Sequence, residues 1–195
     1  MSLDFGAILL AGGRASRMGG IDKPGLLIDG TSLRDRAIAA VRDAGAAPII
    51  AVGPEVRSDA EVLWAREDPP FSGPAAAVIS GLRAMEAAPE WTVLLACDLA
   101  HADVVVGRLL GGIPNLSPAT QGLCLSDAGG RPQWLTGVYR TKALRAAAEA
   151  LGDGRDQAVR ALLTGLDPVL LPALGAEASD VDTWQDYEEL TKEHP

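Results

Sequence analysis

The sequence has few of the residues that most often build disulfides, metal centres and catalytic triads. Its 195 residues include two cysteines and two histidines. Cys97 and Cys124 lie in apolar, strand-like contexts, so we expect buried free thiols rather than a disulfide or a metal site. A histidine-ligated zinc site and a Ser-His-Asp triad are disfavoured, because His101 and His194 are the only histidines.

Long apolar runs and an excess of basic residues are also missing. No apolar run approaches the roughly 20 residues that span a bilayer, and the N-terminal residues MSLDFG lack the features of a signal peptide. The formal net charge is −9, whereas a nucleic-acid surface needs a basic face to displace counterions from phosphates. We therefore expect a cytoplasmic protein that binds neither membranes nor nucleic acid.

Strand-like and helix-like segments alternate along the chain. Such alternation predicts a three-layer α/β/α fold with a mostly parallel, Rossmann-like sheet, and segments 120–125 and 133–139 around a diglycine turn predict a small antiparallel excursion. We expect one domain spanning residues 1–195, present as a monomer or a weak homo-oligomer. The remaining strands are expected at 5–10, 48–52, 62–65, 91–97 and 169–171, and helices over 33–44, from 74, over 104–110, 141–151 and 156–163, and from 184.

A glycine-rich, cationic loop follows the first apolar strand. Residues 11–23 contain three basic residues and one acidic residue, in a chain whose net charge is negative. This local excess of positive charge favours an anionic ligand. Gly12 and Gly13 let backbone N–H groups approach phosphate oxygens closely, and Lys23 can act as a point charge on a phosphate. The loop matches neither GxxxxGK[ST] nor GxGxxG, which disfavours a P-loop kinase and a Rossmann dehydrogenase. The alternative is a mobile loop without a ligand.

Asp98 follows the fourth apolar strand directly. In a parallel sheet this position lies at the same edge as the Gly12 loop, where ligands bind. Mg²⁺ favours one or two carboxylates together with substrate phosphates, so Asp98 is the first candidate for a metal ligand. Asp98 could instead cap the turn that follows.

The segment LAGGRASRMGGIDK resembles the signature loop of the molybdenum cofactor guanylyltransferases, which are nucleotidyltransferases. The resemblance implies a fold of the nucleotide-diphospho-sugar transferase type. It also implies a Mg²⁺-dependent transfer of GMP from GTP to molybdopterin or the molybdenum cofactor, with release of pyrophosphate. The implied partners are GTP, or CTP in a related reaction, and the pterin acceptor.

The resemblance also assigns roles to residues of this sequence. Lys23, Arg17 and Asp98 are expected to be catalytic, and Mg²⁺ is expected on Asp98 and Asp182. Nucleotide contacts are expected from a set of residues at the strand ends and at the start of the second helix: Leu10, Ala11, Gly12, Gly13, Lys23, Val52, Asp68, Gly73, Pro74 and Asp98.

Some positions depart from the family pattern. Ala75 and Ala77 replace the usual leucine and glycine, Ala100 replaces a frequent proline, and Asp180 and Asp182 stand where guanylyltransferases usually have asparagines. The two aspartates are commoner in cytidylyl-transferring relatives. Three alternatives therefore stay open: a CTP-dependent molybdopterin cytidylyltransferase, a sugar-phosphate nucleotidyltransferase, and a degenerate nucleotide-binding regulator without catalysis.

Overall fold

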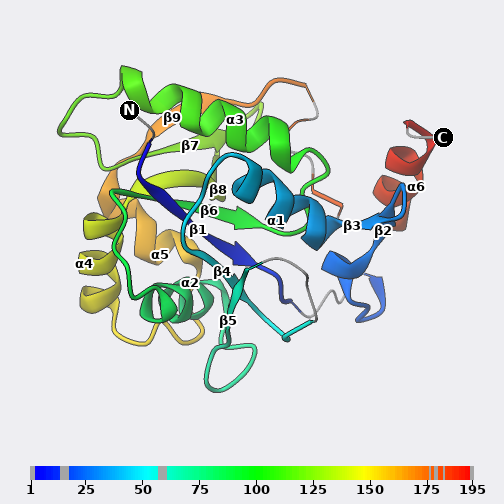
Figure 1. The fold of residues 1–195 in the computed structure, drawn as a ribbon, viewed down its shortest axis with the longest axis horizontal. Coiled ribbons are helices and arrows are strands. Elements are labelled where there is room, and N and C mark those ends of the chain that lie inside the picture. Colours follow the sequence, from blue (N-terminus) through cyan, green and yellow to red (C-terminus); the bar gives the residue numbers. More distant parts are fainter. Residues whose placement is uncertain are drawn as a thin grey trace.

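A computed structural model describes residues 3–13, 18–56, 61–175, 177, 180–181 and 183–193. Over these residues the chain forms a seven-stranded sheet in the order β5-β4-β1-β6-β8-β7-β9, and a small two-stranded sheet, β2-β3 (Figure 1). In the large sheet only β8 runs against its neighbours, β6 and β7. The bounds are Phe5–Leu10 for β1, Leu27–Ile28 for β2, Thr31–Ser32 for β3, Ile49–Val52 for β4, Leu63–Ala65 for β5, Trp91–Ala96 for β6, Gly122–Ser126 for β7, Pro132–Arg140 for β8 and Val169–Pro172 for β9.

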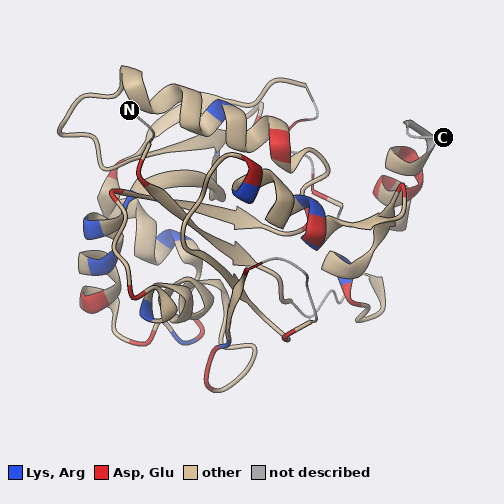
Figure 2. Ribbon diagram, viewed as in Figure 1, with Lys and Arg blue, Asp and Glu red and all other residues tan. Residues whose placement is uncertain are grey.

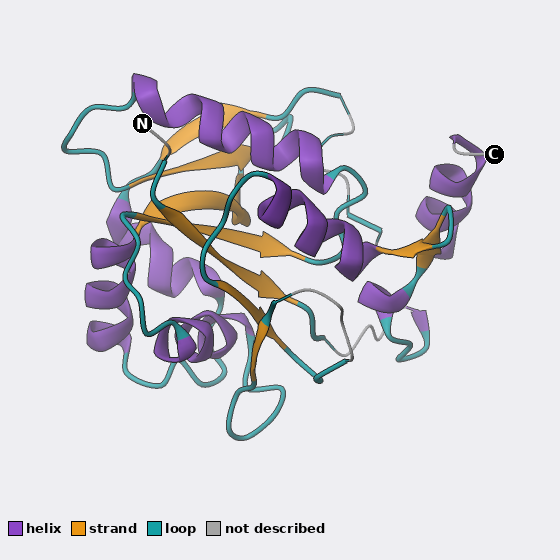
Figure 3. Ribbon diagram, in the orientation of Figure 1, coloured by secondary structure: helices purple, strands orange, loops and turns teal. Residues whose placement is uncertain are grey.

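Helices cover both faces of the large sheet (Figure 3). Helices α1 and α3 pack on one face, and α2, α4 and α5 pack on the other. Figure 2 shows the charged residues on helices and loops, while the central strands carry almost none. The bounds are Leu33–Asp43 for α1, Pro74–Ala84 for α2, Ala102–Gly112 for α3, Thr141–Leu151 for α4, Val159–Leu163 for α5 and Trp184–Glu193 for α6.

The alternation of side chains along β1 explains the three layers. Phe5, Ala7 and Leu9 belong to the apolar cluster beneath α1 and α3. Ile8 and Leu10 belong to the cluster beneath α2, α4 and α5. A strand buried on both faces reads as a continuous apolar run, and all six residues of β1 are buried. The predicted three-layer fold with an antiparallel excursion is therefore confirmed.

Two predicted helix starts are wrong. Helix α3 begins at Ala102 rather than at 104. Helix α5 begins at Val159 rather than at 156. Asp156 has a φ of 56° and its N–H donates to the Ser72 carbonyl at 2.7 Å, so a contact with a distant loop holds this residue out of the helix.

The C-terminal segment returns to the end of β6. Asp180 forms an isolated antiparallel bridge with Leu99, and the Val181 N–H donates to the Asp98 carbonyl at 3.1 Å. A reciprocal capping box then starts α6, because Thr183 and Asp186 each accept the backbone N–H of the other through their side chains. None of the helices in the described residues is long and apolar enough to cross a bilayer. A single domain over 1–195 stays a prediction.

Candidate active site

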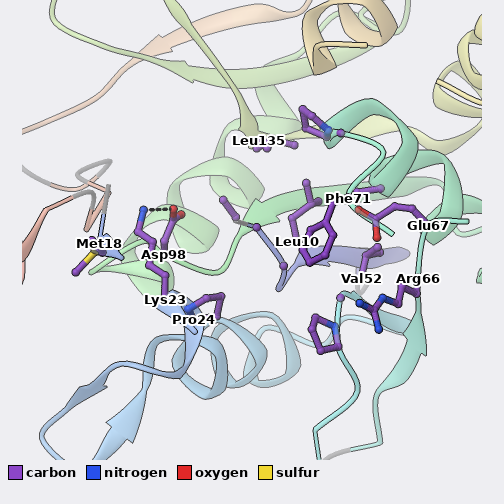
Figure 4. A pocket seen from close by; sticks show the side chains of 18 residues that line it. Leu10, Met18, Lys23, Pro24, Val52, Arg66, Glu67, Phe71, Asp98 and Leu135 are labelled. Carbon is purple, nitrogen blue, oxygen red and sulfur yellow. Dashed lines mark hydrogen bonds and ion pairs between the residues drawn. The ribbon is translucent and has the colours of Figure 1, made fainter. Parts of the chain in front are cut away.

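A cavity of about 600 Å³ opens at the carboxyl ends of β1, β4 and β6 (Figure 4). Its volume is in the range of small-molecule sites, which is roughly 300–1,000 Å³. Most of the predicted nucleotide contacts line this cavity, namely Leu10, Gly12, Gly13, Lys23, Val52, Gly73, Pro74 and Asp98. The structure thus brings together residues that are far apart in the sequence.

Backbone hydrogen bonds continue past the ends of the strands and fix the cavity walls. The Ala11 N–H donates to the Val52 carbonyl at 2.9 Å, and the Cys97 N–H donates to the Leu10 carbonyl at 3.0 Å. The Gly53 N–H donates to the Ala65 carbonyl at 3.0 Å. Ala11 is 2% exposed, so its part in the site is to hold the loop through its backbone.

Gly53 lets the loop after β4 touch the glycine loop after β1. Its φ is 154°, and a Cβ atom there would lie 2.9 Å from the carbonyl carbon and oxygen of Ala11. Such a separation is shorter than a real Cβ contact, and this backbone conformation favours glycine. Gly12 also lies close to this turn, since a Cβ atom on it would lie 3.3 Å from the Gly53 Cα.

Lys23 and Asp98 face each other at one end of the cavity. The Lys23 Nζ donates to the Asp98 Oδ2 at 2.7 Å, as the dashed line in Figure 4 marks. The Lys23 side chain is 13% exposed and that of Asp98 is 24% exposed, so the pair is weakly screened by solvent. This arrangement places a cation and a carboxylate side by side where a polyanionic ligand can enter.

The turn that carries Lys23 is held by α1. Asp22 stands before the short 3₁₀ turn Lys23–Gly25, and its Oδ2 accepts a hydrogen bond at 3.3 Å from Arg34 Nη1. Arg34 is 7% exposed at the start of α1. The packing is tight, because a Cβ atom on Gly25 would lie 2.5 Å from the Asp22 Oδ2. Helix α1 therefore supports the turn that carries Lys23.

The second oxygen of Asp98 is the strongest indication of a metal ligand. Asp98 Oδ1 is buried and has no hydrogen-bonding partner within the described part of the chain. No group of three or more His, Cys, Asp or Glu residues that could hold a metal ion occurs among the described residues. One carboxylate with an unused oxygen fits a cation that takes its other ligands from phosphates and water, as Mg²⁺ does.

The remaining predicted residues lie elsewhere or outside the described chain. Asp68 is exposed and lines a neighbouring cavity of about 200 Å³ rather than the main one. Arg155 contacts it there, because Arg155 Nη2 donates to the Asp68 carbonyl at 3.4 Å. Arg17 and Asp182 are outside the described residues, so their predicted roles stay predictions.

Several residues that line the cavity were missed from the sequence. Arg66, Glu67 and Phe71 lie at the end of the cavity opposite the Lys23 and Asp98 pair (Figure 4). The acidic pair Glu67-Asp68 directly after the third strand was visible in the sequence. Which of the two acids faces the cavity depends on the turn, and no local pattern specifies it.

The two thiols are buried and free, as predicted. Burial raises the pKa of the Cys97 thiol, and the adjacent Asp98 carboxylate raises it further. Burial also raises the pKa of the Cys124 thiol to about 11. Both thiols therefore keep their protons at neutral pH, which disfavours either of them as a nucleophile.

Comparison with known proteins gives consistent matches. The family model "MobA-like NTP transferase domain" matches residues 7–169. A molybdenum cofactor guanylyltransferase from Pseudomonas putida strain F1 is 33% identical over 161 residues, covering 80% of this chain and 81% of that protein.

Solved structures share the fold at lower identity. A nucleotidyl transferase from Methanothermobacter gives a TM-score of 0.74 at 22% identity, covering 98% of this chain and 97% of that one. The molybdopterin-guanine dinucleotide biosynthesis protein A of Archaeoglobus fulgidus gives 0.70 at 17% identity, covering 95% and 96% of the two chains.

Proposed function

The chain belongs to the MobA-like NTP transferase family, and on that premise we propose that it transfers GMP from GTP to molybdopterin or the molybdenum cofactor. The solved nucleotidyltransferases confirm the predicted nucleotide-diphospho-sugar transferase type of fold. The proposed substrates follow from the related guanylyltransferase, which aligns with 80% of this chain.

One observation carries the proposal: Lys23 Nζ and Asp98 Oδ2 lie 2.7 Å apart at the end of a nucleotide-sized cavity. The lysine comes from the loop after β1 and the aspartate from the end of β6. Beside them, the backbone of Gly12 and Gly13 lines the same cavity. This grouping supports a site for a triphosphate with its cation.

The reaction joins two anions, so its main requirement is to neutralise charge and align atoms. An oxygen of the acceptor's terminal phosphate attacks the α-phosphorus of GTP. The bond from the α-phosphorus to the oxygen that bridges to the β-phosphate breaks, and pyrophosphate leaves with the electron pair. The attacking phosphate oxygen is already ionised at neutral pH, so the site needs no histidine base.

The chain's own residues take distinct roles in this proposal. Lys23 neutralises charge on the triphosphate, and Arg17 assists it. The Gly12 and Gly13 amides orient the phosphates. Asp98 would hold a divalent cation, which would offset negative charge on the phosphates. These assignments rest on the cavity geometry for Lys23 and Asp98, and on family resemblance for Arg17.

We further propose that the cation is Mg²⁺, held by Asp98 and Asp182. When bound, Mg²⁺ would offset the charge that develops around the α-phosphate and the leaving group. The first ligand is supported by Asp98 Oδ1, which is buried and has no hydrogen-bonding partner among the described residues. The second ligand rests on family resemblance, because Asp182 lies outside the described residues.

The proposed setting is the cytoplasm, where GTP is abundant, and the proposed form is a single-domain monomer or a weak homo-oligomer. Sedimentation of the purified chain over a range of concentrations checks the oligomeric form.

Pyrophosphate release from GTP and from CTP in the presence of molybdopterin and Mg²⁺ tests the reaction itself. We expect release with GTP, together with a dinucleotide product. Release with CTP instead would identify a cytidylyltransferase. Nucleotide binding with no turnover on the acceptor would identify a regulator and contradict the proposal.

A further inference from the structure

We propose that Arg34 is a positioning residue, which holds Lys23 in place for the triphosphate by binding Asp22 from the start of α1. The inference rests on the proposed function, because it concerns how the chain places the lysine of that site. Arg34 is not one of the described residues that line the cavity, so its effect has to pass through the turn that carries Lys23.

The position of Arg34 relative to the two halves of the site is the first step of the argument. Its Nη1 donates to the Asp22 Oδ2 at 3.3 Å, and Asp22 immediately precedes Lys23. Burial raises the pKa of the Cys97 thiol and the Asp98 carboxylate raises it further, whereas the positive charge of Arg34 lowers it. Arg34 thus contacts the turn that carries the lysine and lies close to the strand end that carries the aspartate.

The second step is that a cation in this position costs stability. Arg34 is the second residue of α1, and the N-terminus of a helix favours anions over cations. The Arg34 side chain is only 9% exposed, whereas that of Asp22 is 63% exposed. An ion pair with a solvated partner offsets little of the cost of taking a charge out of water. The arginine is therefore better explained by what it holds than by any stability that it gives the fold.

The third step connects Arg34 to the reaction. The Lys23–Gly25 turn packs tightly against the Asp22 side chain, since a Cβ atom on Gly25 would lie 2.5 Å from the Asp22 Oδ2. A shift of Asp22 therefore moves the turn, and with it the Lys23 Nζ that donates to Asp98 (Figure 4). A misplacement of about 1 Å at a reacting centre can lower a rate by about 100-fold.

The test is a double-mutant cycle with Arg34→Met and Asp22→Ala, measured as the rate of GMP transfer at saturating GTP, acceptor and Mg²⁺. If Arg34 acts through Asp22, each substitution should lower the rate about 10- to 100-fold, and the double variant should be no slower than the slower single variant. Each variant should also bind GTP more weakly. The affinity for guanosine should stay at the wild-type value, because guanosine has no phosphate for Lys23 to contact.

Urea denaturation separates a positioning role from a structural one. Arg34→Met replaces a buried cation with an apolar side chain of similar length and leaves behind an exposed carboxylate, which water can solvate. The free energy of unfolding should therefore equal or exceed that of the wild type.

Arg42→Met is the matched control, because it removes an arginine from the other end of α1. Arg42 forms an exposed ion pair with Asp43 at 3.2 Å in the last turn of the helix, where a cation is favourable. We expect this variant to transfer GMP at the wild-type rate without a gain in stability.

Three results would overturn the inference while the proposed reaction stands. Wild-type transfer by a folded Arg34→Met or Asp22→Ala protein would show that the pair does not position Lys23. Losses that add in the double variant would show that Arg34 acts apart from Asp22. An Arg34→Met protein less stable than the wild type would show that the arginine serves the fold. A wild type that neither binds GTP nor transfers GMP would instead contradict the proposed function, and the inference would fail with it.

Discussion

Gly53 is the residue at which the two loops of the cavity come closest. Replacing it with alanine would place a Cβ atom 2.9 Å from the Ala11 backbone, and overpacking of this kind typically costs about 1–3 kcal/mol. We expect Gly53→Ala to displace the glycine loop and to weaken GTP binding by about tenfold or more. Titration of GTP by calorimetry measures the change.

Gly165→Ala is the matched control for this substitution. Apart from its own chain neighbours, a Cβ atom there meets no described atom within 4 Å, so the affinity for GTP should stay at the wild-type value. Wild-type affinity in Gly53→Ala would show that the contact between the two loops does not shape the nucleotide site.

Some residues of the site could be predicted from the sequence, and others could not. Lys23 and Asp98 were predictable because one belongs to a glycine loop and the other directly follows a buried strand, and both positions point to the same edge of a parallel sheet. Glu67 was missed. Strand β5 ends at Ala65, and beyond a strand end the alternation of side chains no longer indicates which residue faces inward.

Among the secondary-structure elements, helix α2 packs closely against β1. Gly81 permits this, because a Cβ atom on it would lie 2.6 Å from Ile8 Cγ2 and 3.2 Å from Val52 Cγ2. Both neighbours are buried, β-branched side chains that have little freedom to move. We expect Gly81→Ala to lower the free energy of unfolding by about 1–3 kcal/mol, measured by urea denaturation.

Gly107→Ala in α3 is the control for helix propensity. Apart from its own chain neighbours and the surrounding helix backbone, no described atom lies within 4 Å of a Cβ added at Gly107. Alanine is the better helix former, so this variant should gain up to about 1 kcal/mol. A Gly81→Ala protein as stable as the wild type would contradict the close packing of α2 on β1.

Element boundaries were predictable where the local pattern decides them. Strand β1 matches its predicted bounds because its six residues form one apolar run, and α4 spans Thr141–Leu151, as its period and the following glycine indicate. Helix α5 is shorter than predicted. The hydrogen bond from Asp156 to Ser72 joins segments that are distant in sequence, and local periodicity carries no information about such a contact.

In the molecule as a whole, the reactivity of the two buried thiols depends on whether the core is intact. Cys97 belongs to the cluster on one face of the sheet and Cys124 to the cluster on the other. Burial raises the pKa of Cys124 from 9.0 to about 11, so at pH 8 this group is almost entirely in the unreactive thiol form. We expect both cysteines to resist an aromatic disulfide reagent in buffer and to react fully in denaturant.

The time course of the reaction in buffer is the informative readout. Because both thiols are buried, each should react only when the core opens, and the two rates should be similar. Fast modification of either cysteine in the folded protein at pH 8 would contradict the buried, two-sided core.

The proposed reaction requires the loop after β1 and the end of β6 to act on one triphosphate. The most direct test is the rate of GMP transfer by Asp98→Asn, with Asp103→Asn on α3 as the control for loss of a nearby acid. Removing a group that stabilises charge in a transition state costs about 10²–10³-fold in rate. We predict a loss of that size for an Asp98→Asn protein that still unfolds cooperatively on heating, and wild-type turnover for the control. A folded Asp98→Asn enzyme that transfers GMP at the wild-type rate would contradict the claim.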